Sequence, residues 1–271
     1  MPAVELSRLA RQTEGLAALL DDPVEFRRAC LSLLEGYADR TRRTVWRPDE
    51  DGPWVLGVSR TVLRAVARSL SMEVQGRPDA ARTSADSLWQ SGIREGQALA
   101  AALVQTIEGA GAGKWAEAKV LRARDGSAVG LLAGPALSGW RRVDPSAFLE
   151  FLARVLERAV PRWREFGFRG LESALEDPGF PPVPRVFQIL GATPREAGAE
   201  PRRAQTAAWR AAIHRSPAEA AQTLLEDLPH AREDARDLIL THLTDFPERQ
   251  RARLQRALSD REAEGIIGAS E

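Results

Sequence analysis

The stretch 59-SRTVLRAVARSLSME-73 contains the pattern that decides the fold of this chain. Its apolar residues recur at three- and four-residue intervals, the spacing of one face of an α-helix: Val62, Leu63, Val66 and Leu70. Ser59 precedes them and is a favoured residue at a helix N-cap, because its hydroxyl accepts a hydrogen bond from an unpaired backbone N–H of the first turn. We therefore predict a helix from Ser59 to about Glu73.

The same periodicity extends outward along most of the chain. It predicts helices at 3–20, 23–44, 79–90, 92–108, 144–160, 184–191, 200–215, 217–227, 231–245 and 247–258. Breaks that contain Pro, Gly or Asp separate them, as at Asp21-Asp22-Pro23. Abundant Ala, Leu, Arg and Glu favour helix, because these residues lose little side-chain entropy there. We expect an all-α chain of antiparallel helix pairs, either a helical solenoid or a compact, irregular bundle.

Three segments depart from this pattern. The sequence GAGAGK at 109–114 is predicted to be a flexible break, and WRPDEDGPW at 46–54 a loop. Asp125-Gly126 stands between two apolar runs, which predicts a small β-hairpin at about 118–132. We expect one domain over 1–271, with a sub-boundary at the Pro-rich joint 177–184.

Composition limits the classes of function. The 271 residues include 38 basic and 38 acidic side chains, so no global field attracts nucleic acid or an anionic membrane, although a local basic face is compatible with balanced totals. Cys30 is the single cysteine, which excludes an internal disulfide. The sequence has neither a signal-peptide core nor the roughly 18 consecutive apolar residues of a membrane span, so we expect a cytoplasmic protein without a membrane partner.

No motif for a metal or cofactor is present. His214, His230 and His242 lack metal-ligand spacing, and Lys114 is followed by Trp115 where a phosphate loop needs Ser or Thr. We therefore expect neither a metal nor another cofactor.

The chain contains seven tryptophans, and these are more informative about function than its histidines or Lys114. Trp140 and Asp144 are four residues apart, so on a helix they share a face that would suit a developing cation. The alternative is that Asp144 simply caps a helix that begins at Pro145, and these residues alone favour the cap.

Several segments resemble, in order, the AlkD-type alkylpurine DNA glycosylases, a family with a HEAT-like helical fold. VLGVSRTVLRAVARSL at 55–70 is similar to the family's L-G-[IV] loop and helix, and SLWQSGIREGQALAAALV at 87–104 to its Leu-Trp…Arg-Glu signature. WRRVD at 140–144 resembles the W-D-x-V-D segment, and AQTAAWRAAIHRSPAEA at 204–220 is weakly similar to a helix with an active-site Trp.

The resemblance implies a HEAT-like helical-repeat fold and hydrolysis of the N-glycosidic bond of cationic N3- or N7-alkylpurines in duplex DNA, without metal or cofactor. It places Trp140, Asp144 and Trp209 in the active site. The Asp144 carboxylate would stabilise the oxocarbenium-like sugar and position water, while the Trp faces contact the sugar.

The sequence also departs from the family. Arg141 replaces the first acidic residue of W-D-x-V-D, Arg142 follows it, and Arg185 is the nearest candidate for the family's active-site Arg. Together with Lys119, Arg122 and Arg124 of the predicted hairpin, these residues are candidate DNA contacts. Three functions follow: a glycosylase, a non-catalytic DNA-structure-binding relative, and a protein-interaction scaffold. We expect a monomer and rank double-stranded DNA first among partners.

Overall fold

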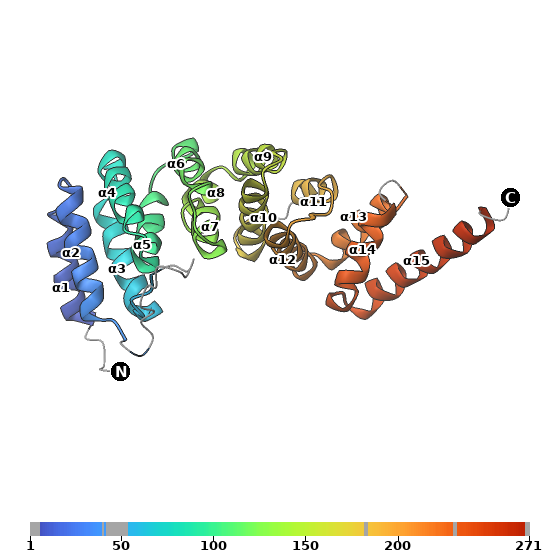
Figure 1. Cartoon of the computed structure of the whole chain (residues 1–271), viewed down its shortest axis with the longest axis horizontal. Coiled ribbons are helices and arrows are strands. Elements are labelled where there is room, and N and C mark those ends of the chain that lie inside the picture. The colour runs from blue at the N-terminus through green and yellow to red at the C-terminus, as the bar shows by residue number, and fades with distance from the viewer. Residues whose placement is uncertain (1–5, 40, 42–53, 182–183, 230–231, 269–271) are drawn as a thin grey trace. The chain divides into compact units, whose positions relative to one another are not determined.

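A computed structural model of the chain describes residues 6–39, 41, 54–181, 184–229 and 232–268, and within these ranges it is helical (Figure 1). The described residues form no β-strand, only isolated bridges between Ala38 and Val58 and between Trp54 and Ile93. The all-α prediction is therefore confirmed. Residues 46–53 of the predicted loop and His230 lie outside the described ranges.

The chain divides into two compact units, Met1–Phe148 and Leu149–Glu271. The division falls inside α9 (Pro145–Leu156), upstream of the Pro-rich joint. No helix among the described residues is both long enough and apolar enough to cross a membrane.

The first unit arranges its helices in two neighbouring rows. It contains α1 (Leu6–Ala17), α2 (Pro23–Gly36), α3 (Arg60–Glu73), α4 (Pro78–Gln90), α5 (Arg94–Val104), α6 (Ala110–Val120), α7 (Gly126–Ala133) and α8 (Ser138–Val143). In one row α1 packs on α3, α3 on α5 and α5 on α7, whereas in the other α2 packs on α4. The helix α4 also lies along α5 and joins the rows.

The predicted caps start two of these helices. The Asp22 carboxylate accepts hydrogen bonds from the backbone N–H groups of Val24 and Glu25 and begins α2, with Pro23 at its first position. Ser59 accepts from Val62 N–H at 3.4 Å and begins α3. Of the four predicted apolar residues of α3, Val62, Val66 and Leu70 are buried and Leu63 is half-buried.

Glu95 fixes the loop that leads into α3. Its side chain is buried, and its carboxylate accepts hydrogen bonds from the backbone N–H groups of Leu56, Gly57 and Val58 at 3.0, 2.9 and 3.3 Å. Arg94 N–H also donates to the Trp54 carbonyl at 2.8 Å. The LGV and Arg-Glu segments, 37 to 39 residues apart, are thus joined by direct contact.

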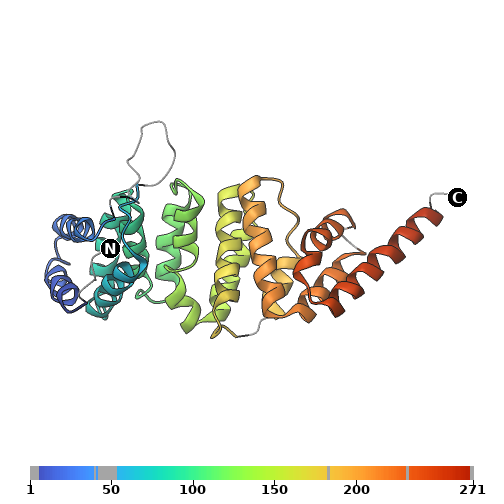
Figure 2. The ribbon, with the colours of Figure 1, turned by 90° about the horizontal axis from the view of Figure 1, so that it is seen from below.

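The second unit is organised around α10 (Pro161–Glu176) and α12 (Ala199–Arg215), which lie side by side (Figures 1 and 2). Gly167 and Gly170 of α10 leave room for Leu156 and Leu152 of α9, because a Cβ at either glycine would lie under 3.0 Å from the leucine side chain. Buried Glu165 accepts from Arg162 at 2.7 Å and from Arg169 at 3.0 Å, which balances its charge.

Shorter helices complete this unit. They are α11 (Pro184–Gly191), α13 (Pro217–Asp227), α14 (Arg232–His242), the 3₁₀ turn η1 (Leu243–Asp245) and α15 (Glu248–Gly268). The helix α13 packs on α11, α12, α14 and α15.

The predicted hairpin at 118–132 is wrong, and so is the predicted flexible break at 109–114. Residues 110–120 form α6, in which Trp115 and Lys119 share a face and both contact Asp86 of α4, at 2.9 and 2.6 Å. Asp125 is not in a hairpin turn but is the N-cap of α7, where it accepts from Ala128 N–H at 2.8 Å. The apolar run after it is a short buried helix.

We predict that Glu95→Ala destabilises the protein by about 3 kcal/mol, because three backbone donors lose a charged acceptor. Urea denaturation monitored by circular dichroism measures this loss. Glu73→Ala, at the exposed end of α3, is the matched control and should change stability by less than about 0.5 kcal/mol. Equal stabilities of the two variants would contradict the anchoring role of Glu95.

Candidate functional site

The residues that the resemblance implicates in catalysis fall in both compact units. Trp140 and Asp144 belong to the first unit and Trp209 to the second.

Trp140 packs into the interior of the first unit. It is 5% exposed, and its ring meets Phe148 edge to face with centroids 6.1 Å apart. Gly113 of α6 lies against the same ring, since a Cβ there would come within 2.6 Å of it. Gly139 lets α8 approach the backbone of Gln105, at the end of α5. The indole face is therefore used for packing in this structure.

Asp144 lies between α8 and α9 and is exposed. Its Oδ1 accepts a hydrogen bond from Ala147 N–H at 2.9 Å, the geometry of a helix cap. The cap that the residues alone favoured is thus present, and it occupies one of the two carboxylate oxygens.

Trp209 is fully buried in α12 of the second unit. Its indole Nε1 has no hydrogen-bond partner among the described residues. Its ring contributes to the core beneath α12.

The predicted DNA contacts divide into engaged and exposed residues. Arg141 is buried, and Arg185 donates to both carboxylate oxygens of Glu150 at 3.0 and 3.3 Å. Lys119 pairs with Asp86 and lies 4.4 Å from the centroid of the Trp115 ring. Arg122, Arg124 and Arg142 are exposed and form no ion pair with a described residue, although Arg142 donates to the Ser138 carbonyl of its own helix at 3.2 Å.

A basic stripe on α3 escaped the sequence analysis. Arg60, Arg64 and Arg68 are all exposed, and none makes a hydrogen bond or ion pair with another described residue. They recur every four residues, so they follow one line along the helix. Val62 and Val66, two residues away and therefore on the opposite side, are buried. We call these three arginines the α3 stripe; the four-residue spacing was the available signal.

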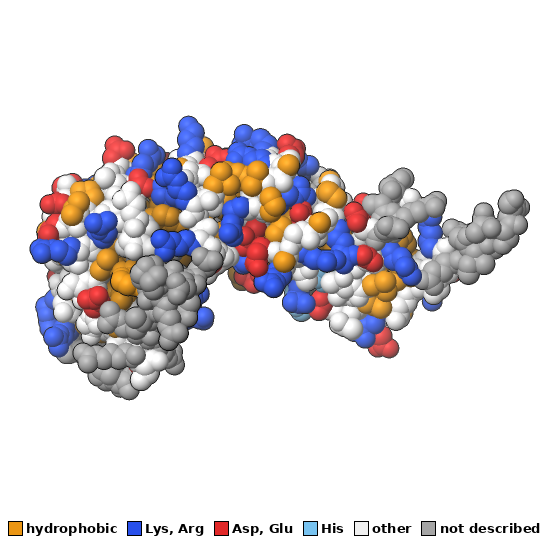
Figure 3. Space-filling view, in the orientation of Figure 1, with side chains coloured by type: hydrophobic (Ala, Val, Ile, Leu, Met, Phe, Trp, Pro, Cys, Tyr) orange, Lys and Arg blue, Asp and Glu red, His pale blue; other side chains and the backbone are white. Residues whose placement is uncertain are grey.

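Charge is otherwise dispersed. On the face shown in Figure 3, basic side chains are spread among acidic and apolar ones rather than gathered in one large patch. Electrostatic attraction to a polyanion therefore depends on local arrangements such as the α3 stripe.

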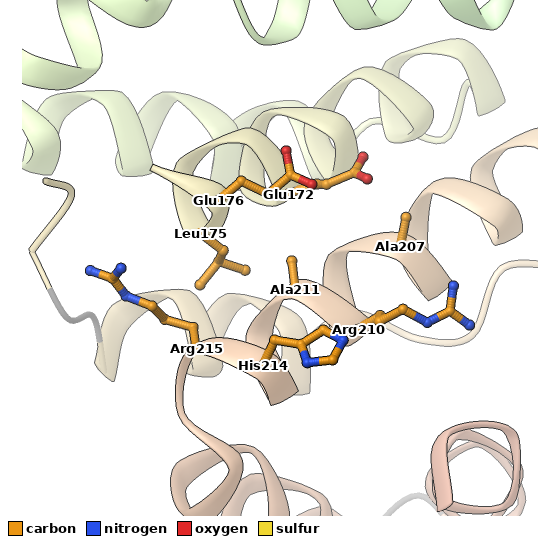
Figure 4. Close-up of a pocket in the computed structure, with 8 residues that line it drawn as sticks. All are labelled: Glu172, Leu175, Glu176, Ala207, Arg210, Ala211, His214 and Arg215. Atoms are coloured by element: carbon orange, nitrogen blue, oxygen red, sulfur yellow. The ribbon is translucent and has the colours of Figure 1, made fainter. Parts of the chain in front are cut away.

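A cavity of about 320 Å³ lies on the seam between α10 and α12 (Figure 4). Glu172 and Glu176, one turn apart, come from α10, whereas Arg210, His214 and Arg215 come from α12. Burial, followed by the nearby Glu176 charge, raises the pKa of Glu172, although Arg169 opposes the shift. This carboxyl retains its proton to a higher pH than an ordinary glutamate.

The arginines beside this cavity already have partners. Arg215 donates to the carbonyls of Pro178 and Phe180, and Arg210 to Asp245 at 3.4 Å. Asp245 also lies 2.9 Å from His242 Nδ1. Burial lowers the pKa of His242, although the Asp245 carboxylate opposes the shift. Arg210 and His242 thus join α12 and α14 to η1 through Asp245. Among the described residues, Glu172, Glu176 and His214 of the cavity have no side-chain hydrogen bond or ion pair.

No group of three or more His, Cys, Asp or Glu side chains in the described ranges is arranged to hold a metal ion. Cys30 is fully buried, and burial raises the pKa of its thiol to about 12, which suppresses the reactive thiolate.

Comparison with known proteins adds no identity: the sequence matches neither a protein-family model nor a curated protein. The candidate sites are therefore supported by their geometry alone.

We predict that Asp144→Ala lowers stability by about 1 kcal/mol through loss of the α9 cap. Asp144→Asn and Asp144→Ser retain a side-chain acceptor and should stay within about 0.5 kcal/mol of wild type. Thermal and urea denaturation of the three variants measure this order. An Asp144→Ala variant as stable as wild type would contradict the cap.

Proposed function

We propose that this protein binds duplex DNA through the α3 stripe, as a helical-repeat protein of the HEAT-like kind. The fold proposal is supported by the successive packing of α1, α3 and α5 in one row and of α2 on α4 in the other. Neighbour-on-neighbour packing of this kind is typical of helical repeats.

The observation that carries the DNA proposal is the availability of three aligned guanidinium groups. Four residues of α-helix rise about 6 Å, so the stripe spans roughly 12 Å from Arg60 to Arg68. That length covers about three to four nucleotides of one DNA strand. Guanidinium groups suit phosphate because their planar donors form paired hydrogen bonds.

The arginines of the second unit serve as a contrast. Most of those with described partners contact carboxylates or carbonyls of their own unit, as Arg162, Arg169 and Arg185 do. The arginines of the α3 stripe have no such partner among the described residues. A molecule that binds to them therefore breaks no existing ion pair among these residues.

Substitution of the stripe tests this proposal. In Arg60→Gln/Arg64→Gln/Arg68→Gln, the slope of log K against log salt for a 20-base-pair duplex should fall by about three, because each lost phosphate contact lowers it by about one. Fluorescence anisotropy between 50 and 200 mM salt gives both slopes.

The control removes the same charge elsewhere. Arg202, Arg249 and Arg256 are exposed residues of the second unit without a hydrogen bond or ion pair to a described side chain. Their triple Gln variant should keep the wild-type slope. An equal loss of slope in both triple variants would refute the α3 stripe as the DNA contact. A wild-type protein that does not bind the duplex would favour the protein-interaction scaffold instead.

Glycosylase activity is the second proposal, and it rests on Asp144. Its carboxylate is exposed, four residues after Trp140, and only Oδ1 is engaged in the cap. The remaining oxygen is free of described partners and carries the negative charge that an oxocarbenium-like sugar requires.

Single-turnover release of 7-methylguanine from a defined duplex tests this second proposal. Wild type should release the base, and Asp144→Asn should reduce the rate by about 100-fold or more, because Asn caps α9 but lacks the charge. Retained duplex binding without release would exclude the catalytic proposal and leave the DNA-binding one intact.

A further inference from the structure

A groove of about 480 Å³ lies between α11 and α13, two helices of the second unit that are remote in sequence from the α3 stripe. Phe187 and Gly191 of α11 contribute its apolar part, and Gln188 adds an uncharged polar side chain. From α13 come Glu219, Thr223 and Glu226. One wall is therefore apolar or neutral, and the other is acidic.

Close approach of the two helices at Gly191 shapes one end of the groove. A Cβ at this position would lie 2.7 Å from Asp227 Oδ2 and 2.9 Å from Thr223 Cγ2. The missing side chain lets the α11 backbone rest on α13 there. Phe187, one turn earlier, also lines the groove, although only 5% of it is exposed.

The acidic wall follows one face of α13. Glu219 and Glu226 are seven residues apart, two helical turns, so they project from the same side. Both are exposed. Among the described residues, the Glu226 carboxylate accepts a hydrogen bond from Gln222 alone, at 2.6 Å, and the Glu219 carboxylate has no ion pair. Their charges are therefore available to a cation from outside.

One contact within the protein shows which kind of group lies against the acidic wall of the groove. Arg253 of α15 donates a hydrogen bond to Gln222 Oε1 at 2.7 Å. Gln222 lies between the two glutamates in the sequence. A guanidinium group thus already lies against the acidic face of α13. The groove extends beyond this contact and is larger than one guanidinium group needs.

We propose that the groove between α11 and α13 binds a short basic segment of a partner protein. One apolar side chain of the segment covers Phe187 and Gly191, and a Lys or Arg on either side of it pairs with Glu219 and Glu226. The combination of an apolar floor with one acidic wall selects for such an amphipathic segment, because burial and charge pairing are satisfied together.

Selection from a random dodecapeptide phage library against the full-length protein tests this surface without a bias toward basic sequences. Selected peptides should share a bulky apolar residue flanked by Lys or Arg. A synthetic copy of the most enriched peptide, labelled with fluorescein, then gives a Kd by anisotropy at 150 mM salt.

Charge reversal supplies the decisive comparison. Glu219→Lys/Glu226→Lys should weaken peptide binding at least ~10-fold, whereas Glu108→Lys/Glu157→Lys, an equal charge change at exposed residues that do not line the groove, should leave it unchanged. Ala192→Trp, at the residue that follows α11, fills the groove without changing its charge and should also weaken binding. A circular dichroism melt confirms that each variant is folded.

Three results would overturn the proposal: no enriched peptide, peptides without basic residues, or equal binding to wild type and the charge-reversed variant. Binding of arginine amide with the same affinity as the peptide would also overturn it, because a single cation would then suffice. The α3 stripe lies in the other unit, so failure here leaves DNA binding untouched.

Discussion

The carboxylate of Glu95 holds together the part of the molecule on which the proposed function depends. A buried charge is costly unless donors surround it, and three consecutive backbone N–H groups from Leu56 to Val58 supply those donors. The loop is thereby fixed immediately before Ser59, the residue that begins α3. Because the start of a helix sets which residues face outward, this contact also orients the α3 stripe.

The same contact gives a physical meaning to the resemblance with alkylpurine DNA glycosylases. Two of the segments that carry it, LGV at 56–58 and Arg94-Glu95, are partners in one hydrogen-bonded unit. This contact gives the two segments a structural role. The segment WRRVD likewise has structural uses, since Trp140 packs in the core and Asp144 caps a helix. Such motifs indicate a fold more directly than an activity.

Local signals predicted much of this fold. Asp22-Pro23 and Ser59 begin helices as expected, and the predicted helix at 184–191 matches α11. The hairpin predicted at Asp125-Gly126 is wrong because an Asp before a short apolar run is compatible with a helix cap as well as with a hairpin turn. The contacts of Trp115 and Lys119 with Asp86, 29 or more residues earlier, favour the helical outcome, and no local pattern reveals them. The helix α10 was not predicted at all.

The candidate site was less predictable, because exposure depends on tertiary packing. Trp140 packs against Phe148 and against Gly113 of α6, and Arg141 is buried. Lys119 and Arg185 form ion pairs with Asp86 and Glu150, which lie far from them in the sequence. The α3 stripe, by contrast, follows from four-residue spacing opposite Val62 and Val66.

The contact between α3 and DNA can be observed directly by photo-crosslinking. A benzoylphenylalanine at position 64, in the middle of the α3 stripe, should form a covalent adduct with a labelled duplex under ultraviolet light, and the same group at exposed position 202 should not. Adducts at position 202 but not 64, or at neither position under conditions where the duplex is bound, would contradict the account.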